Sequence, residues 1–262
     1  MIRFDHKPGL VVYVTCGDPA LSATEQIVLS AIDAGTDVIE LGVPFSDPVA
    51  DGPVIQRASE RALKNRTSLS DVLSVAAKVR KARPQAGLII FTYWNPVLRL
   101  GLDRFCNEAQ HAGVDGALIT DLTVEESDDY VRAMRARDLA TVFLAAPTST
   151  DERLRAIAEA SSGFVYAVSR TGITGAQKQI SEDAEHLVNR LRKHTQLPIA
   201  VGFGISTPEQ FAGVGGFADA AVIGSAIVQI VEQYGSQAAV RVAEFISGLR
   251  AEAGQSWASA HP

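Results

Sequence analysis

The stretch LVVYVTCGDPALSATEQIVLSAIDAGTDVIEL, residues 10–41, contains two short apolar runs separated by a helical pattern. The first run, residues 10–15, predicts a strand, and residues 24–35 predict a helix that ends at a glycine. Residues 37–41 predict the next strand. Because valine, isoleucine and leucine dominate both runs, the stretch is typical of parallel strands covered on both faces.

The same alternation continues along the chain. Further strands are expected at residues 87–92, 116–120, 140–145, 164–169, 198–202 and 220–224. Helical sequence is expected up to about Ala82 after the second strand, and then near residues 101–112, 125–136, 151–160 and 182–194.

These strand–helix units, in 262 residues without a linker or a change of composition, predict one single-domain (β/α)8 TIM barrel over residues 1–262. A doubly wound open sheet is the alternative fold. Residues 1–9 are expected to be a short lead-in, and residues 254–262 a frayed tail.

Composition and charge exclude several classes of protein. The net charge of −6 disfavours a general binder of nucleic acid or anionic membranes. The two cysteines are too few for a disulfide framework, and the five histidines show no metal-ligand spacing, so no metal site is expected. The N-terminal residues lack the apolar core of a signal peptide, and no apolar run is long enough to span a membrane, which predicts a cytoplasmic protein.

Glu40 ends the second predicted strand, at the end where (β/α)8 barrels carry their chemistry. Side chains alternate along a strand, so Glu40 points into the barrel if Ile39 and Leu41 pack outward on helices. A carboxyl group in that place loses water and has a raised pKa, which suits general acid–base catalysis near neutral pH. The alternative is a structural carboxylate that caps a neighbouring loop.

Asp51 follows in the segment PVADGP, which by itself is typical of a turn. Considered without its neighbours, Asp51 is expected to be a turn former.

The segments AVGFGIS (200–206) and AVIGSAIV (221–228) end the seventh and eighth strands, where barrel enzymes often bind phosphate. Gly202, Gly204 and Gly224 allow the backbone to approach a ligand, and Ser225 opens a helix whose free N–H groups attract anions. No lysine or arginine lies in residues 196–226, so amides and hydroxyls would hold the phosphate. The alternative role of these glycines is tight turn geometry.

A dinucleotide-binding fingerprint is excluded, because the third glycine of that motif would fall at Thr207. Residues 169–179 are long for a loop after a strand and predict either a lid over substrate or a plain mobile loop. Tyr166 shares the parity of Phe164 and is expected either to line the barrel interior near its mouth or to fill the core.

Together these motifs resemble the tryptophan synthase alpha subunit family. The longest is ELGVPFSDPVADGP at residues 40–53. It is accompanied, in the family's order, by GDP (17–19), YWNP (93–96), SRTGITG (169–175), GFGIS (202–206) and GSAIV (224–228). The resemblance extends over about residues 10–250 and agrees with the strand count in implying a (β/α)8 barrel.

The resemblance implies retro-aldol cleavage of indole-3-glycerol phosphate to indole and glyceraldehyde 3-phosphate. It assigns Glu40 as the catalytic acid–base and Asp51 as the acceptor of a hydrogen bond from the indole N–H. Tyr166 matches a tyrosine near that glutamate. One well-placed carboxyl group can both protonate C3 of the indole and deprotonate the side-chain hydroxyl.

The resemblance also implies binding residues. Phosphate binding maps to Gly175, Phe203, Gly204, Gly224 and Ser225, the indole pocket to Ile55, Phe91 and Tyr93, and the lid contact to Thr174. Contacts with a beta subunit map to Pro44, Asp47 and Asn95. That beta partner carries pyridoxal phosphate and converts indole to L-tryptophan in an alpha2beta2 heterotetramer, so no cofactor is expected in this chain.

Three other functions compete with this one: a stand-alone lyase that releases free indole, a non-catalytic activator of the beta chain, and a different phosphate-binding barrel. Two departures from the family stand out. Only a short segment precedes the first strand, where relatives carry a further helix, so the bottom of the barrel is expected to be less well covered. Thr123 stands where the family has a proline, which is expected to loosen that loop.

Overall fold

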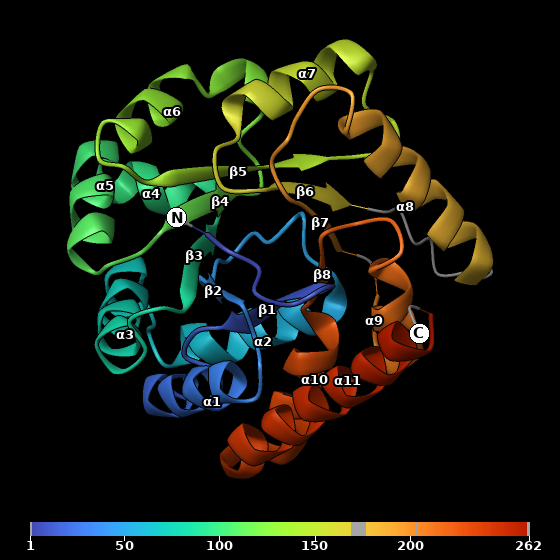
Figure 1. The fold of residues 1–262 in the computed structure, drawn as a ribbon. Coiled ribbons are helices and arrows are strands. Elements are labelled where there is room, and N and C mark those ends of the chain that lie inside the picture. The colour runs from blue at the N-terminus through green and yellow to red at the C-terminus, as the bar shows by residue number, and fades with distance from the viewer. Residues whose placement is uncertain (1, 169–176, 203, 261–262) are drawn as a thin grey trace.

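The computed structural model describes residues 2–168, 177–202 and 204–260, and the side chains of 177–181 and 252–260 lie outside this description. Figure 1 shows a ring of strands surrounded by helices. The strands in the described residues form a closed parallel barrel in sequence order: β1 (Gly9–Thr15), β2 (Val38–Gly42), β3 (Gly87–Thr92), β4 (Gly116–Ile119), β5 (Ala140–Ala145), β6 (Val165–Val168), β7 (Ile199–Gly202) and β8 (Ala220–Ile223). Because β8 pairs with β1, the predicted barrel is confirmed and the open sheet is excluded.

Helices follow every strand. They are α1 (Leu21–Asp33), α2 (Pro53–Lys64), α3 (Leu69–Ala82), α4 (Trp94–Leu100), α5 (Leu102–His111), α6 (Asp128–Arg135), α7 (Asp151–Ala160), α8 (Gln177–Leu191), α9 (Pro208–Val214), α10 (Ser225–Tyr234) and α11 (Ala238–Ala260). Short 3-10 turns, η1 (Val124–Glu126) and η2 (Gly235–Gln237), precede α6 and α11.

Two helical segments are divided more finely than the sequence predicts. The helical sequence before Ala82 is α2 and α3, and Ser68 starts the second helix with a capping box in which its side chain and that of Asp71 satisfy each other's backbone N–H groups. The segment 101–112 is preceded by the separate helix α4. Gly101 divides α4 from α5 because its φ of 92° is a conformation that side chains other than glycine rarely adopt.

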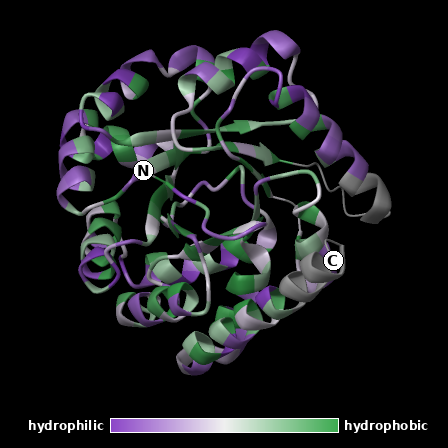
Figure 2. Ribbon diagram, viewed as in Figure 1, coloured by the Kyte–Doolittle hydropathy of each residue, from purple (hydrophilic) through white to green (hydrophobic). Residues whose placement is uncertain are grey.

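Alternate side chains of each strand enter two different apolar layers. On β2, Ile39 and Leu41 face outward and are fully buried in the core between the strands and the helices. Val38 faces inward and packs in the barrel interior, and Glu40 shares its parity. Figure 2 shows this arrangement as apolar strands surrounded by helices whose polar residues lie on the rim.

The N-terminal segment closes the bottom of the barrel. It runs across the end of the strand ring in Figure 1, and Ile2 and Phe4 pack in the interior layer. The ring of Phe4 meets that of Phe164 edge-on at 6.0 Å. Two apolar side chains of the short lead-in therefore occupy this end of the barrel. The expectation that this end is less well covered than in relatives stays a prediction.

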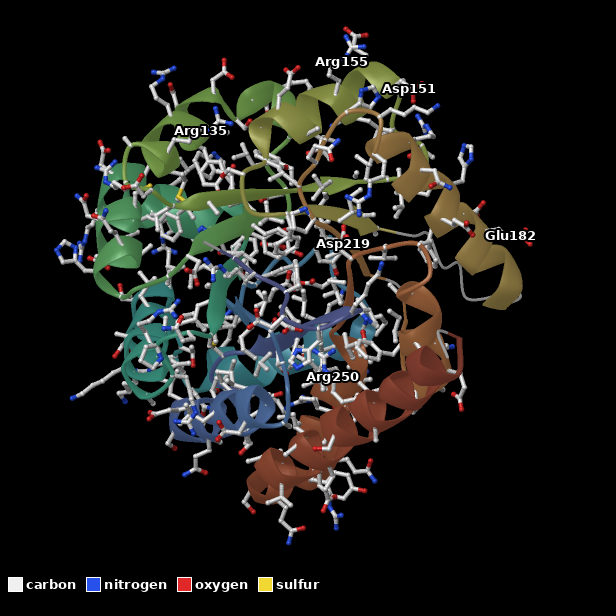
Figure 3. All side chains as sticks on the ribbon, in the orientation of Figure 1. Arg135, Asp151, Arg155, Glu182, Asp219 and Arg250 are labelled. Carbon is white, nitrogen blue, oxygen red and sulfur yellow. The ribbon has the colours of Figure 1, made fainter. Side chains whose placement is uncertain are left out.

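Arg250 of α11 ties the end of the barrel to the last helix. Its guanidinium donates hydrogen bonds to the carbonyl oxygens of Pro8 and Gly35 and to the buried carboxylate of Asp37. Figure 3 shows Arg250 beside the ring of strands, whereas Asp151 lies among the outer helices. Segments more than 200 positions apart in the sequence are thereby joined.

The structure bears on the expectations for the C-terminal tail and for the loop after the sixth strand. The helix α11 continues to Ala260, within the stretch for which the sequence predicts a frayed tail. Of the predicted lid 169–179, residues 169–176 lie outside the described residues, and 177–179 belong to α8. Within the part of the chain that is described, no helix is long and apolar enough to cross a membrane.

Candidate active site

The carboxyl group of Glu40 lies inside the barrel, near the C-terminal ends of the strands. In the strand register Glu40 stands between Tyr13 of β1 and Ile89 of β3. Its side chain is fully buried, and neither carboxyl oxygen has a hydrogen-bond partner in the described protein. Burial raises the pKa of Glu40 to about 8, so the group holds its proton at neutral pH while keeping the capacity to release it.

Asp51 lies in the loop between β2 and α2, in a less buried setting. The hydroxyl of Tyr93 donates a hydrogen bond of 3.0 Å to its Oδ2, and Ala50 N–H donates to the same hydroxyl at 3.0 Å. Gln56, in the first turns of α2, donates to the Asp51 carbonyl at 2.8 Å. Burial raises the pKa of Asp51 to about 6, against the lowering effect of the Tyr93 hydrogen bond. Two carboxyl groups of different acidity therefore belong to the same end of the barrel.

Two tyrosines occupy the barrel interior beside these carboxyl groups. A Cβ atom added at Gly202 would lie 2.3 Å from the hydroxyl of Tyr166, and one added at Gly42 would lie 2.3 Å from the hydroxyl of Tyr13. Burial, and then the charge of Glu40, raises the pKa of the Tyr166 hydroxyl. Tyr166 therefore lies in the barrel interior, and its part in the site beside Glu40 stays a prediction.

Tyr13 was not among the residues singled out in the sequence. Burial, and then the charge of Asp51, raises the pKa of its hydroxyl, which accepts a hydrogen bond from Thr15 at 3.3 Å. The available signal was its parity with Val11, which faces inward on the same strand.

Apolar side chains form one wall beside the carboxyl groups. The rings of Phe91 and Tyr13 meet edge-on with their centres 5.0 Å apart. Ile55 of α2 packs in the same small cluster as Val228 of α10. The buried ring of Tyr93 lies against Phe45 with centres 5.1 Å apart. The predicted indole-pocket residues Ile55, Phe91 and Tyr93 therefore lie on the side of the barrel where β1, β2 and β3 end.

The start of α10 offers backbone N–H groups to a ligand. Gly224 precedes the helix and provides no side-chain cap, and the first helical hydrogen bond runs from Val228 N–H to Gly224. The start of α9 differs, because Thr207 caps it. The N–H groups at Ser225 and the two residues after it therefore have no partner within the helix, a setting that favours an anion.

The rest of the predicted phosphate site is described only in part. Gly204 is exposed with a φ of +36°. Thr174, Gly175 and Phe203 lie outside the described residues.

The residues expected at a partner interface lie at the rim of the barrel, in the loop after β2 and at the start of α4. Asp47 and Asn95 are exposed, whereas Pro44 is buried. Pro44 and Asn95 line a groove of about 460 Å³ between the β2 loop and α4. Val49, in the same loop after β2, is 84% exposed.

The loop that carries Thr123 in place of proline is tied to its neighbour. Asp121 accepts a hydrogen bond of 2.7 Å from Trp94 N–H at the start of α4.

Among the described residues, no group of three or more histidine, cysteine or acidic side chains is placed to hold a metal ion.

Comparison with known proteins decides the family. The sequence model described as "Tryptophan synthase alpha chain" matches residues 2–254. This chain belongs to the tryptophan synthase alpha chain family. The tryptophan synthase alpha chain of Solibacter usitatus is 50% identical over 92% of this chain and 90% of its own length. That of Laribacter hongkongensis is 45% identical over 93% of this chain and 92% of its own.

Solved structures of the family have the same fold. The alpha subunit from Legionella pneumophila superposes with a TM-score of 0.87 at 33% identity, covering 95% of this chain and 93% of its own. A chain of the tryptophan synthase complex from Pyrococcus furiosus has a TM-score of 0.86 at 36% identity, covering 94% of this chain and 98% of its own. The family predicted from the motif at residues 40–53 is confirmed.

Proposed function

We propose that this tryptophan synthase alpha chain cleaves indole-3-glycerol phosphate to indole and glyceraldehyde 3-phosphate and passes indole to a beta subunit. The observation that carries the proposal is the carboxyl group of Glu40, fully buried in the barrel and without a hydrogen-bond partner among the residues that the structure describes. A buried polar group without a partner destabilises the fold, so its presence at the catalytic end of a barrel favours a functional reason. The chain is accordingly a carbon–carbon lyase.

Glu40 supplies and recovers one proton in the proposed reaction. Its protonated form donates to C3 of the indole, which leaves a positive charge on the indole ring. The resulting carboxylate then takes the proton of the hydroxyl on the carbon bonded to C3, and the carbon–carbon bond breaks as its electrons return to the ring. Glu40 ends in its starting form, so a single group with a pKa near neutrality serves both steps.

Asp51 stabilises the charge that develops on the ring by accepting a hydrogen bond from the indole N–H. Its lower pKa of about 6 suits this role, because Asp51 is ionised at the pH where Glu40 still holds its proton. Tyr166 contributes to the site as a neighbour of Glu40. Tyr93 orients Asp51 through its hydrogen bond and, with Ile55 and Phe91, forms the apolar wall for the indole.

The substrate phosphate binds at the start of α10. Its ligands are the backbone of Gly224 and Ser225, together with Gly204, Phe203 and Gly175 in segments that follow other strands. The lid residue Thr174 instead contacts Asp51 when the lid closes. Because helix N–H groups carry partial positive charge, this site needs no lysine or arginine.

A beta subunit binds at the rim that carries Pro44, Asp47 and Asn95, in an alpha2beta2 heterotetramer. Pyridoxal phosphate belongs to that partner, and this chain works without a cofactor. The free, buried thiols of Cys16 and Cys106 suit a reducing cytoplasm.

The decisive experiment is an assay of indole release from indole-3-glycerol phosphate by the wild type and by Glu40→Gln. We expect kcat to fall by roughly a thousandfold or more in the variant, since its amide cannot transfer the proton. Near-normal turnover by Glu40→Gln would contradict the assignment. Adding a beta subunit separates the two lyase functions: a large rise in rate supports the complex, and an unchanged rate supports the stand-alone enzyme.

A further inference from the structure

The GDP motif at residues 17–19, which has no role in the mechanism above, is held by a helix of the candidate active site. Asp18 lies in the loop after β1 and is only 2% exposed. Arg61 of α2 donates two parallel hydrogen bonds to its carboxylate, Nε to Oδ1 and Nη2 to Oδ2, both at 2.8 Å. Paired bonds of this kind fix direction as well as distance.

The same guanidinium also contacts α10. Arg61 Nη1 donates to Oε1 of Glu232 at 2.7 Å. Arg57, one turn earlier on α2, donates to both oxygens of Glu232 at 2.9 and 2.8 Å, but it does not contact Asp18. Arg61 is therefore the side chain that joins the β1 loop, α2 and α10 at one point.

Both helices in this junction lead to candidate active-site groups. Helix α2 begins two residues after Asp51, and Gln56 in its second turn holds the Asp51 carbonyl. Helix α10 begins at Ser225, where the substrate phosphate is expected. Because a helix is stiff over two turns, a shift at the Arg61 junction is transmitted to the start of each helix.

The packing around the junction supports a fixed arrangement. Asn65, the residue after α2, donates to the carbonyl oxygens of Gly17 and Pro19 at 3.0 and 2.7 Å. Between the two helices and β1, Ala58 and Val228 pack with Tyr13. The GDP loop is thus bonded to α2 from both its side-chain carboxylate and its backbone.

We propose that Arg61 is a positioning residue for the lyase reaction, setting the Asp51 loop and the phosphate-binding end of α10 at their working separation. This inference rests on the proposed function. Arginine suits the task because its planar group presents hydrogen bonds to Asp18 and Glu232 at the same time. Lysine can carry the charge but not this geometry.

The test is steady-state kinetics of indole-3-glycerol phosphate cleavage by Arg61→Met. Loss of the junction displaces the Asp51 loop and the start of α10, so KM rises and kcat falls together. The ratio kcat/KM falls on the order of 10- to 100-fold, as expected for a displacement of up to about 1 Å. The matched control on the same helix is Arg57→Met. This exposed side chain bonds Glu232 and, on its own helix, the carbonyl oxygen of Pro53, and its loss is expected to change kcat/KM by less than about twofold.

A second control separates positioning from stability. Arg80 pairs with Asp115 at the opposite end of the barrel, where the side chains are 22% and 21% exposed. Arg80→Met is expected to lower the melting temperature while leaving KM and kcat unchanged. If Arg61→Met and Arg80→Met retain the same kinetics well below their melting temperatures, the inference is overturned.

Arg61→Lys covers the case in which Arg61→Met does not fold. It keeps the positive charge, and we expect a folded protein with an intermediate rise in KM and fall in kcat. If Arg61→Lys has wild-type kinetics, the paired hydrogen bonds of the guanidinium are not required for positioning, and the inference is overturned. If the wild type and Arg80→Met cleave no substrate, the proposed function itself fails, which is distinct from cleavage that is insensitive to Arg61.

Discussion

At the scale of single residues, the same burial that makes the Glu40 carboxyl group costly to the fold makes it useful in the proposed reaction. In water the group would lose its proton near pH 4.5, but inside the barrel its pKa is about 8. No described protein group bonds to it, so its hydrogen-bonding capacity is available to a substrate. The parity of Val38 and Glu40 predicted this placement, because the apolar residues between and after them had to face the helices.

The stability of Glu40→Gln relative to the wild type is predicted to depend on pH. Between pH 4.5 and about 8 the unfolded chain has lost this proton while the folded chain retains it. The free energy of unfolding of the wild type therefore falls as pH rises, by about 1.4 kcal/mol per pH unit from this group. Glutamine does not titrate, so the variant gains stability over the wild type across the window. Urea unfolding of both proteins at several pH values measures this, and a constant difference would contradict the assigned burial.

Tyr93→Phe is predicted to move the acid limb of the kcat profile to higher pH. The Tyr93 hydroxyl donates to Asp51 and lowers its pKa, which lies near 6 with the bond in place. Removing a hydrogen bond to a charged group costs about 1.5–3 kcal/mol, which corresponds to a rise of about one to two pH units. Measuring kcat from acid to neutral pH tests this. Tyr130→Phe is the control, since Tyr130 bonds the backbone of Ala117 instead.

At the scale of elements, the strands were predictable and the divisions between helices were less so. Runs such as residues 140–145 are apolar because both faces of a parallel strand are buried, and the observed β5 has those bounds. The start of α3 depends on a capping box at Ser68, and the start of α5 on the positive φ of Gly101. Both signals are short, and a continuous helical pattern obscures them.

Side-chain contacts between different helices and loops near the candidate site could not be predicted from the sequence. Asp18 and Arg61 are 43 positions apart, and Arg61 and Glu232 are 171 apart. In the sequence each is an ordinary charged residue with no periodic pattern. Only the closure of the barrel, which brings α2, α10 and the β1 loop together, makes their meeting visible. The sequence did not indicate a role for Tyr13 for a related reason, since the neighbouring carboxyl groups of Glu40 and Asp51 come from another strand and from a loop.

Ser225→Asp is predicted to raise KM with a smaller effect on kcat. The added carboxylate at the start of α10 repels the substrate phosphate by about 1–4 kcal/mol, so KM rises at least about fivefold. The helix itself tolerates the change, because acidic residues stabilise a helix N-terminus. Ser236→Asp, which adds the same charge beyond the far end of α10, is the control. An equal KM in both variants would argue against phosphate binding at Ser225.

At the scale of the whole molecule, the two ends of the barrel have different tasks. Acidic groups, tyrosines and free helix N–H groups gather where the strands end, whereas apolar side chains and the Arg250 cluster close the opposite end. Division of this kind allows the catalytic end to carry unpaired buried groups, because the closed end supplies compensating stability. The short N-terminal lead-in thus takes part in the fold despite its length.

Phe4→Ala is predicted to destabilise the barrel without changing its chemistry. Phe4 is partly buried against Phe164, so its removal leaves a cavity at the closed end and lowers the free energy of unfolding by about 2–4 kcal/mol. The kcat of the folded variant stays at the wild-type value, because Glu40 lies at the other end. Val240→Ala, at an apolar position of α11 that is 61% exposed, should change stability by less than about 0.5 kcal/mol. Urea unfolding and the indole assay on both variants test this, and equal stabilities would show that the lead-in is not part of the core.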